Sequence, residues 1–509
     1  MLIYRKISDR GIVMKKILCV ILSFILVIPF AVFASAAGNE EGATVNDVVI
    51  EKVETDTPVI VVRGMNFTGG LQFDRGTENA KAVQPEFDAA ELFNYLTKTF
   101  AAVVSEFSIE AGVSVICEYV TKLFGSYPCD ENGNSLHTNI TAASFPEACS
   151  NYPEYFVASA TDEISLVASL MARYGGDMVY YFDYDWRLDP MDNADLLDSL
   201  VQTALSDHNT DKADFICCSM GGSIMAAYMA EYGYSNIDTI VSNTSVIFGT
   251  DVITDLFQGN VCFDADAVER YISAMVPSIA GFVKVLSFTG VLDGLCNFIN
   301  SFAKKYEAKI YEETLVPTFA TLPGFWSMCK ADEYATCREF IFGGREEQYK
   351  GLLERLDNFH YNVAAKRTEI IDEAIASGVN FCVIAVYGSP MVPAYERAKY
   401  QSDGTVETAP MSGGALVSVV GCELTEEQLS AGDSRYVSAD KCINASTCAY
   451  KDYTWFIKDA GHVIGGYGSD CVNFIFALLE SEEQPTVNTW SEYPQFMQSS
   501  AAEMLIPLE

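Results

Sequence analysis

The sequence predicts an α/β fold, with a mostly parallel central sheet, helices on both of its faces and a largely helical insertion. Two observations lead to this prediction. Short apolar runs alternate with segments of helical periodicity, which is typical of a parallel sheet. The apolar runs are also continuous, as expected of strands that are covered on both faces. We expect strands at residues 58–64, 178–186, 214–218, 238–247, 379–388 and 454–460.

The predicted helices lie between these strands or after the last one. The first of them ends in a pair of glycines, which is a common helix stop. Apolar residues recur in all of them at a spacing that places them on one helical face. We expect helices at residues 163–176, 194–205, 223–233 and 471–480.

Two long stretches interrupt this alternation. Residues 76–160 are helical in part and lie within the first part of the core, residues 37–249. Residues 250–375 separate that part from the second part of the core, residues 376–509. Insertions of this length are usually functional, and lids are a common kind. The second insertion is unusually apolar, so we expect its side chains to pack on the core, line an acyl pocket or face lipid.

The first 36 residues have the features of a secretory signal peptide. Five basic residues precede an apolar run at 17–33, and small residues follow at 34–36. The run of 17 residues is shorter than the roughly 20 that span a bilayer. We therefore predict cleavage after Ala36 and a secreted, soluble mature protein, translated from Met1 or from Met14.

The composition argues against several classes of partner. The formal net charge is −37, and removal of the basic signal peptide brings it near −41, which disfavours nucleic acid and anionic membranes as partners. The chain has only four histidines and no CxxC pair, so we expect no metal site and no cofactor. Its 15 cysteines suit an oxidising compartment. Three pairs flank short polar loops and are candidate disulfides: Cys129/Cys149, Cys329/Cys337 and Cys442/Cys448.

Ser219 is the candidate nucleophile. It stands in DFICCSMGG at 214–222, where a strand runs into a helix through small residues. Such a turn exposes a serine at the carboxyl edge of a sheet, although a turn of small residues also arises for steric reasons alone. Cys217 and Cys218 are rival nucleophiles, but both fall within the expected strand.

A serine needs a base with a pKa near neutrality and an acid that orients it. His462 is the best candidate base, because it follows a late strand and opens a glycine-rich loop. Asp403 is the first candidate for the acid, with Asp433 and Asp440 as alternatives. The backbone N–H groups of Met220, after the nucleophile, and of Met65, after the first strand, are the candidate oxyanion hole.

Several of these segments together resemble the lecithin:cholesterol acyltransferase-like branch of the α/β-hydrolase lipases. The resemblance spans residues 58–466 and is clearest in the core. Its most specific part is DYDWRLDP, which precedes the Ser219 turn by about 30 residues. Cys217 and Arg63 depart from the glycine and proline usual in these enzymes. The matching segments are PVIVVRGMNFTGG, DYDWRLDP, DFICCSMGG, FGTDVITDLF, AVYGSPMVPAY, SDGTV and GHVIGG.

The resemblance implies an α/β-hydrolase fold in which residues 250–375 form a cap, with Ser219, Asp403 and His462 as the catalytic triad. We thus predict a secreted hydrolase of carboxylic esters, of lipids or small molecules, that works through an acyl-enzyme. Two alternatives stay open: an acyltransferase to an alcohol, and an inactive binding protein on the same fold. The expected partners are the ester substrate and, transiently, a lipid interface that the cap contacts.

Overall fold

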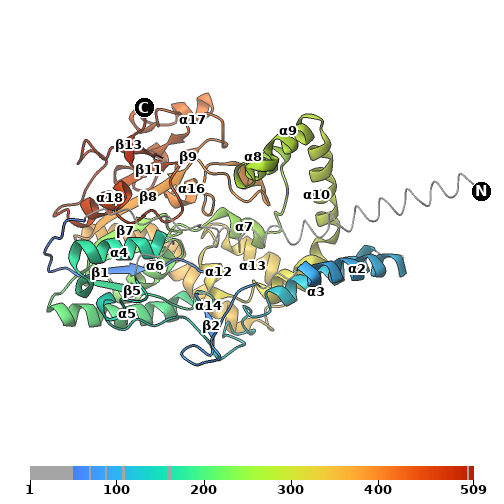
Figure 1. Cartoon of the computed structure of the whole chain (residues 1–509), viewed down its shortest axis with the longest axis horizontal. Helices are drawn as coiled ribbons and strands as arrows, with labels where there is room; N and C mark the ends of the chain where they lie inside the picture. Colours follow the sequence, from blue (N-terminus) through green and yellow to red (C-terminus); the bar gives the residue numbers. More distant parts are fainter. Residues whose placement is uncertain (1–49, 68–69, 86–88, 106–108, 157–161, 501–503) are drawn as a thin grey trace, which may run out of the picture.

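The computed structural model describes residues 50–509 except 68–69, 86–88, 106–108, 157–161 and 501–503. The predicted signal peptide lies outside the described residues. The centre of the molecule is an eight-stranded sheet in the order β13-β12-β11-β8-β7-β6-β1-β5, in which β13 alone runs antiparallel (Figure 1). The strands are β1 (Val59–Val62), β5 (Val179–Phe182), β6 (Ala213–Cys218), β7 (Ile237–Asn243), β8 (Asn380–Tyr387), β11 (Thr454–Lys458), β12 (Phe496–Ser499) and β13 (Leu505–Pro507).

The predicted α/β class and the mostly parallel sheet are confirmed, and all six predicted strands form. Three details were wrong. The strand predicted at 238–247 ends at Asn243. The strand predicted at 178–186 ends at Phe182, and the next residues bind the loop after β1. The strand at 454–460 is not the last, because β12 and β13 follow it at the edge of the sheet. β12 and β13 are only partly buried, so they lack the continuous apolar run that marks the other six strands.

Alternate residues of each strand supply two separate hydrophobic clusters, one on each face of the sheet. Ile60 and Val62 pack with the face covered by α5 (Pro190–His208) and α6 (Gly221–Tyr232). Their neighbours Val59 and Val61 pack with the face covered by α4 (Asp162–Tyr174) and α18 (Asp470–Leu479). These four helices are the predicted ones, and they fix the sheet between two apolar layers.

Residues 70–156 add two helices and a small antiparallel sheet beside the core. The helices α2 and α3 pack against each other (Figure 1). The bounds are β2 (Gln72–Phe73), β3 (Lys81–Ala82), α2 (Ala89–Ser105), α3 (Ile109–Leu123), β4 (Ile140–Thr141) and the 3-10 turn η1 (Cys149–Asn151); η2 (Gly176–Met178) precedes β5.

The segment between β7 and β8 is mostly helical. Its helices α12 to α15 join the main hydrophobic cluster, whereas α8 to α10 enclose a small cluster of their own, formed by Ala265, Val283, Leu292 and Cys296. The bounds are α7 (Asp251–Phe257), α8 (Ala265–Met275), η3 (Pro277–Ile279), α9 (Ala280–Phe288), α10 (Val291–Ile310), the π-helical turn η4 (Tyr311–Leu315), α11 (Val316–Thr318), α12 (Pro323–Ser327), α13 (Tyr334–Phe342), α14 (Lys350–Asn362), η5 (Ala364–Lys366) and α15 (Arg367–Ala376).

Helices α8 to α10 form an arm that stands away from the sheet (Figure 1). Among the described residues, no single helix combines the length and the apolar content of a membrane span. Two consecutive helical segments, Pro277–Phe288 and Val291–Thr318, meet both criteria together, but they are bent by 82° at their junction. The end of α8, the first of these segments and the start of the second form the end of the arm. These residues, 271–292, are called the arm tip below.

A long connection between β8 and β11 carries the loop of Asp403. It contains short elements only: η6 (Glu396–Lys399), α16 (Thr408–Met411), β9 (Leu416–Val417), α17 (Glu426–Ser430), η7 (Ser434–Tyr436), β10 (Ile443–Asn444), η8 (Ala445–Thr447) and η9 (Lys451–Tyr453). β9 and β10 pair as a separate two-stranded sheet.

The fourteen cysteines among the described residues are all unbridged, unlike the three predicted pairs. Cys129 and Cys149 belong to the clusters on opposite faces of the sheet, which keeps their side chains apart. Only the Cys329/Cys337 pair brings its sulfur atoms close, at 3.5 Å. The short polar loops between cysteines therefore indicated one pair of side chains that meet, Cys329 and Cys337, and no bond joins them.

Candidate active site

Ser219 lies in a sharp turn between β6 and α6, in a strained backbone conformation. Its φ angle is +48°, a value that residues other than glycine rarely adopt. This conformation costs about 1–3 kcal/mol of folding free energy. The two residues after Met220 must be glycine: a Cβ on Gly221 would lie 2.4 Å from the carbonyl oxygen of Val62, and one on Gly222 2.4 Å from Oγ of Ser245. The close approach of neighbouring strands thus forces the turn that presents Ser219.

The two cysteines before Ser219 are poorly placed as nucleophiles. Cys217 and Cys218 are fully buried in β6, and burial raises the pKa of both thiols well above the usual value. The reactive form of cysteine is the thiolate, which this environment disfavours.

Asp403 and His462 are in direct contact. Nδ1 of His462 lies 2.7 Å from Oδ2 of Asp403. The carboxylate of Asp403 is fully buried, and its other oxygen accepts hydrogen bonds of 2.7 Å from the backbone N–H groups of Thr405 and Val406. The imidazole keeps 21% of its surface exposed. A carboxylate that is held by two backbone N–H groups therefore orients a histidine ring that is partly exposed.

The alternative acids have other partners. Asp433 binds Arg435 at the surface, and Asp440 pairs with Lys458 at 2.9 Å. Of the three candidate acids, Asp403 is the one that contacts His462.

The end of β7 joins the Ser219 turn to the His462 loop. The carbonyl oxygen of Asn243 accepts a hydrogen bond from the N–H of Ser219 at 3.4 Å. The Asn243 side chain binds the backbone of Ile464 twice, at 2.8 and 3.2 Å, and Oγ1 of Thr244 accepts from the N–H of Val463 at 2.9 Å.

These bonds have a common geometric origin. Because β6, β8 and β11 are parallel, the residues that follow them all meet at the carboxyl edge of the sheet. Ser219 follows the first, Asp403 comes in the connection after the second, and His462 follows the third. The structure therefore gathers the three residues at one edge, with Asn243 between two of the loops.

The loop after β1 lies directly beside Ser219. A Cβ placed on Gly64 would be 2.8 Å from Cβ of Ser219 and 3.5 Å from its Oγ, so only glycine fits there without displacement. The N–H of Gly64 is used, because it donates to Glu163 at 3.0 Å. Among the described residues, no acceptor binds the N–H groups of Met65 or Met220. Met220 follows Ser219 in the chain, and Met65 follows Gly64, the residue that lies beside Ser219.

A buried ionic cluster supports this loop. Arg63 pairs with Asp183 at 2.7 Å and lies 3.8 Å from Glu163, which also accepts from the hydroxyl of Tyr181. The hydroxyl of Tyr184 donates to the carbonyl oxygen of Arg63 at 3.1 Å. Arg63 was noted in the sequence as a departure from the expected proline. Its guanidinium instead holds the loop through charges that the chain places 100–120 residues away.

The DYDWR segment fastens the same loop from outside the sheet. Nε1 of Trp186 donates to the carbonyl oxygen of Asn66 at 3.0 Å, and its ring packs on Phe67 with centroids 4.9 Å apart. Gly324 of α12 approaches so closely that a Cβ there would lie 2.8 Å from Cε of Met220. The helical segment between β7 and β8 thus covers Met220 next to the Ser219 turn.

The Asp403 loop is anchored by a carboxylate that the sequence did not single out. Glu407 is buried and accepts from Oγ1 of Thr250 at 2.6 Å, from the N–H of Asp251 at 3.1 Å and from the hydroxyl of Tyr395. Burial, followed by the charge of Asp251, raises the pKa of Glu407. The loop is therefore tied to the start of the helical segment between β7 and β8.

His360 cannot act as a base in this fold. Only 1% of its surface is exposed, its ring stacks on Tyr334 at 3.8 Å, and its Nε2–H donates to the carbonyl oxygen of Trp326 at 2.8 Å. Burial, and next the charge of Arg367, lowers its pKa to about 3. Within the described part of the chain, Nδ1 has no hydrogen-bond partner. The residue is a neutral part of the core.

No model of a known protein family matches this chain, and a search of curated proteins finds no similar one. The predicted residues Ser219, Asp403, His462, Met65 and Met220 all follow strands at the carboxyl edge of the sheet. The supporting roles of Glu163, Asp183, Asn243 and Glu407 were not predicted. Two of these residues had a signal in the sequence: Asp183 begins the DYDWRLDP segment, and the polar Asn243 stands inside an apolar strand run.

Gly64→Ala should slow hydrolysis of p-nitrophenyl butyrate, a soluble ester of the predicted class, by about 100-fold. The added Cβ must displace either the loop or Ser219, and a shift of about 1 Å in an active site costs roughly that factor. Gly294→Ala is the matched control, because its Cβ meets open space on α10 and should leave the rate unchanged. Equal rates for both variants would show that the loop after β1 does not bear on Ser219.

His360 predicts a pH dependence of stability. The native side chain stays neutral down to about pH 3, whereas the unfolded one takes up a proton below about pH 6.5. Stability should therefore fall by about 1.4 kcal/mol per pH unit from this group as the pH drops through that window. His360→Gln removes the contribution, so its free energy of unfolding in urea should depend less steeply on pH between 6.5 and 4.5. Parallel profiles of variant and wild type would contradict the neutral assignment.

Proposed function

We propose that this protein is a serine hydrolase that cleaves carboxylic esters through an acyl-enzyme on Ser219. One observation carries the proposal: the buried, doubly capped carboxylate of Asp403 lies 2.7 Å from Nδ1 of His462, at the strand edge where the strained Ser219 turn also lies. A carboxylate on Nδ1 fixes the imidazole as the tautomer whose Nε2 can take a proton. That is the machinery an alcohol needs to become a nucleophile near neutral pH.

In the first half of the reaction, Nε2 of His462 accepts the proton of Ser219 as Oγ attacks the ester carbonyl. The negative charge that develops on the carbonyl oxygen is stabilised by the N–H groups of Met65 and Met220. Asp403 stabilises the imidazolium without taking its proton. The imidazolium then protonates the departing alcohol, and the acyl group stays on Ser219 as an ester.

In the second half, water enters with His462 as its base, attacks the acyl-enzyme through the same oxyanion site and releases the acid. We favour water over an alcohol acceptor, because no feature of the chain identifies a second acceptor. The proposal extends to the α/β-hydrolase fold, with residues 250–375 as a cap over Met220. The apolar character of that region supports lipid esters as substrates. Secretion is proposed on the composition of residues 1–36 alone.

The proposal is tested by turnover of p-nitrophenyl esters from acetyl to palmitoyl by purified variants. Ser219→Ala should abolish hydrolysis, because Oγ is the atom that forms the acyl-enzyme. Asp403→Asn should lower kcat by about 10⁴, because an amide cannot hold the productive tautomer or stabilise the imidazolium.

Asp440→Asn is the matched control for the acid, since Asp440 pairs with Lys458 and should change kcat by less than threefold. Turnover that survives in Ser219→Ala after the protein is purified to homogeneity would refute the proposal. Equal losses in the two aspartate variants would remove Asp403 from the triad.

A further inference from the structure

The arm tip exposes an unusual number of apolar side chains. Half of the 16 large apolar residues that are exposed in the described chain lie between positions 275 and 298. Phe288 has 92% of its surface exposed, and Phe282 and Val285 of the same helix have 65% and 57%. The opposite side of α9 is apolar as well, because Val283 and Leu286 pack into the arm's own small cluster. Apart from the exposed Lys284, the long side chains of α9 are therefore apolar on both sides of the helix.

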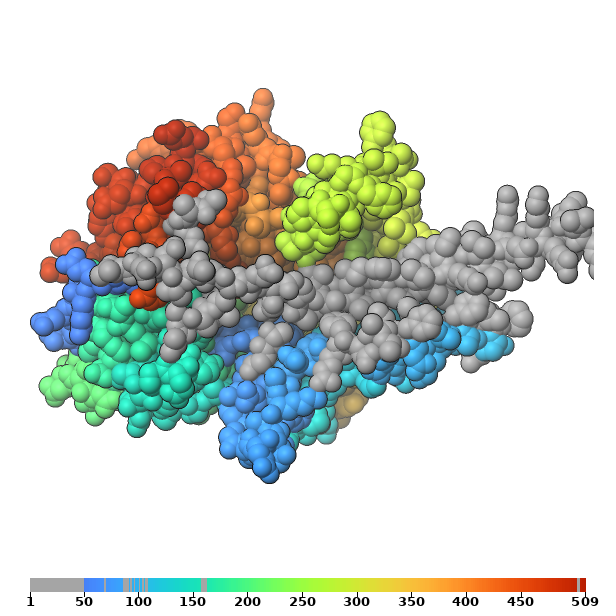
Figure 2. All heavy atoms as spheres, in the orientation of Figure 1, coloured from blue at the N-terminus to red at the C-terminus, as the bar shows by residue number. Residues whose placement is uncertain are grey.

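The patch lies on a projecting part of the molecule. In Figure 2 the arm projects from the rest of the molecule, so its tip can contact an extended flat surface. Contiguous exposed apolar surface of this kind marks a site of interaction with protein or lipid. The six side chains that define the patch are Met275, Ile279, Phe282, Val285, Phe288 and Val291.

Charge separates the tip from the rest of the chain. From Tyr271 to Leu292 the sequence contains one charged residue, Lys284, and no carboxylate, although the whole chain has 69 acidic residues. The tip of this acidic protein can therefore move from water into an apolar environment without burying a carboxylate. Burial of an unpaired charge is costly, so this composition suits an apolar surrounding.

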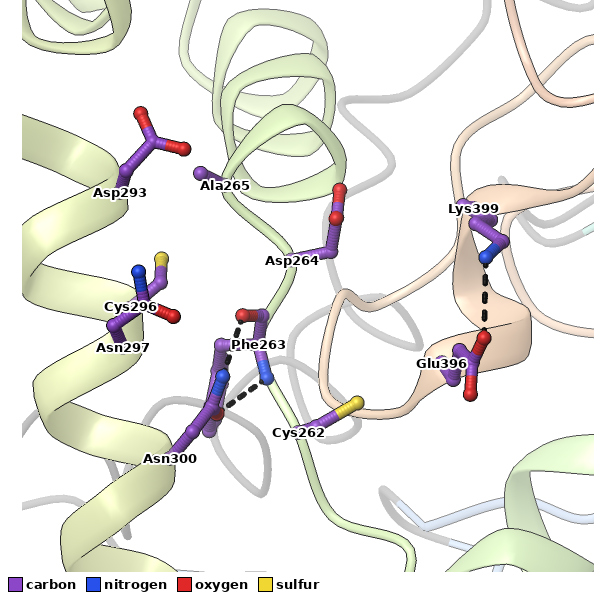
Figure 3. A pocket seen from close by; sticks show the side chains of 10 residues that line it. All are labelled: Cys262, Phe263, Asp264, Ala265, Asp293, Cys296, Asn297, Asn300, Glu396 and Lys399. Atoms are coloured by element: carbon purple, nitrogen blue, oxygen red, sulfur yellow. Dashed lines mark hydrogen bonds and ion pairs between the residues drawn. The ribbon is translucent and has the colours of Figure 1, made fainter. Parts of the chain in front are cut away.

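The root of the arm is polar, in contrast to the tip. Asn300 of α10 accepts from the N–H of Phe263 at 2.8 Å and donates to its carbonyl oxygen at 3.0 Å, which fastens the two ends of the arm together (Figure 3). Beside these bonds, a cavity of about 320 Å³ is lined by Asp264, Asp293, Glu396 and Lys399 among others. Polar and charged side chains thus lie at the root of the arm, and apolar side chains lie at its tip. This distribution suits a segment whose tip enters the boundary between water and lipid.

We propose that the arm tip docks on a neutral lipid surface, with Phe282, Val285 and Phe288 inserted among the lipid chains and the polar root left in water. The binding itself does not depend on the proposed function. Its biological role does, because the lipid surface would be the place from which the hydrolase takes its substrate. The helical pair Pro277–Phe288 and Val291–Thr318 together meets the length and hydropathy of a membrane-embedded segment, and it is bent by 82° at the junction, which lies in the arm tip.

A neutral surface fits the charge of the molecule better than the other occupants do. A second copy of the chain would bring two bodies of net charge −37 together, and an anionic membrane would repel the acidic body in the same way. A zwitterionic lipid surface carries no such penalty.

The test is flotation of the full mature chain with phosphatidylcholine vesicles, in the Ser219→Ala background so that binding is measured apart from hydrolysis. We expect the protein to bind, F282S/F288S to weaken binding at least tenfold, and 30% phosphatidylglycerol in the vesicles to weaken binding at low salt. Leu196→Ser is the matched control, because Leu196 is 57% exposed on α5, outside the arm, and should bind as the parent does.

A second measurement does not depend on how well the serine variant folds. Phe288→Trp places an indole at the tip, and its fluorescence should shift to the blue when phosphatidylcholine vesicles are added, whereas Leu196→Trp should not shift. Absence of binding, unchanged binding by F282S/F288S or tighter binding to the anionic vesicles would overturn the proposal. A dimer in sedimentation velocity that F282S/F288S dissociates would also overturn it, because a second copy would then cover the tip. Failure of ester hydrolysis with intact vesicle binding would instead refute only the proposed function.

Discussion

The contact between Asp403 and His462 is the interaction on which the rest of the site depends. The carboxylate of Asp403 is fully buried, and two backbone N–H groups and the imidazole of His462 hold it in place through hydrogen bonds. The 403–406 turn is in turn fixed by Glu407, whose hydrogen bonds reach Thr250 and Asp251 at the entry to the helical segment. The orientation of one ring therefore rests on a chain of contacts that begins outside the sheet.

Close packing of the backbone imposes the second constraint. A Cβ on Gly64, Gly221 or Gly222 would lie within 3 Å of an atom of a neighbouring segment, so the loop after β1, the Ser219 turn and the residues after β7 are tightly packed. Ser219 adopts a positive φ in this packing, and the Arg63–Asp183 pair and the Trp186 ring hold the neighbouring loop. The strained Ser219 turn and the buried charges beside it thus lie in the same tightly packed region.

The sequence indicated the parts of the molecule that follow from local rules. Strands buried on both faces must be apolar throughout, so six were found from composition, whereas β12 and β13 at the partly exposed edge were not. Ser219, Asp403 and His462 stood out because few residue types perform their chemistry. The roles of Glu163 and Asp183 did not, since they arise only from contacts with Arg63 and Gly64 across about 100 residues. The apolar insertion was visible too, but which of its faces is exposed depends on how the arm packs.

The most direct measurement is the identity of the residue that an active-site-directed fluorophosphonate modifies. The folded protein is labelled and then digested, and the modified peptide is identified by mass spectrometry. The probe traps an activated serine as a stable phosphonyl ester. The result expected here is a single adduct on Ser219, which disappears when His462 is replaced by alanine. No adduct, or an adduct on another residue that forms equally well without His462, would contradict the assignment of this strand edge as the catalytic centre.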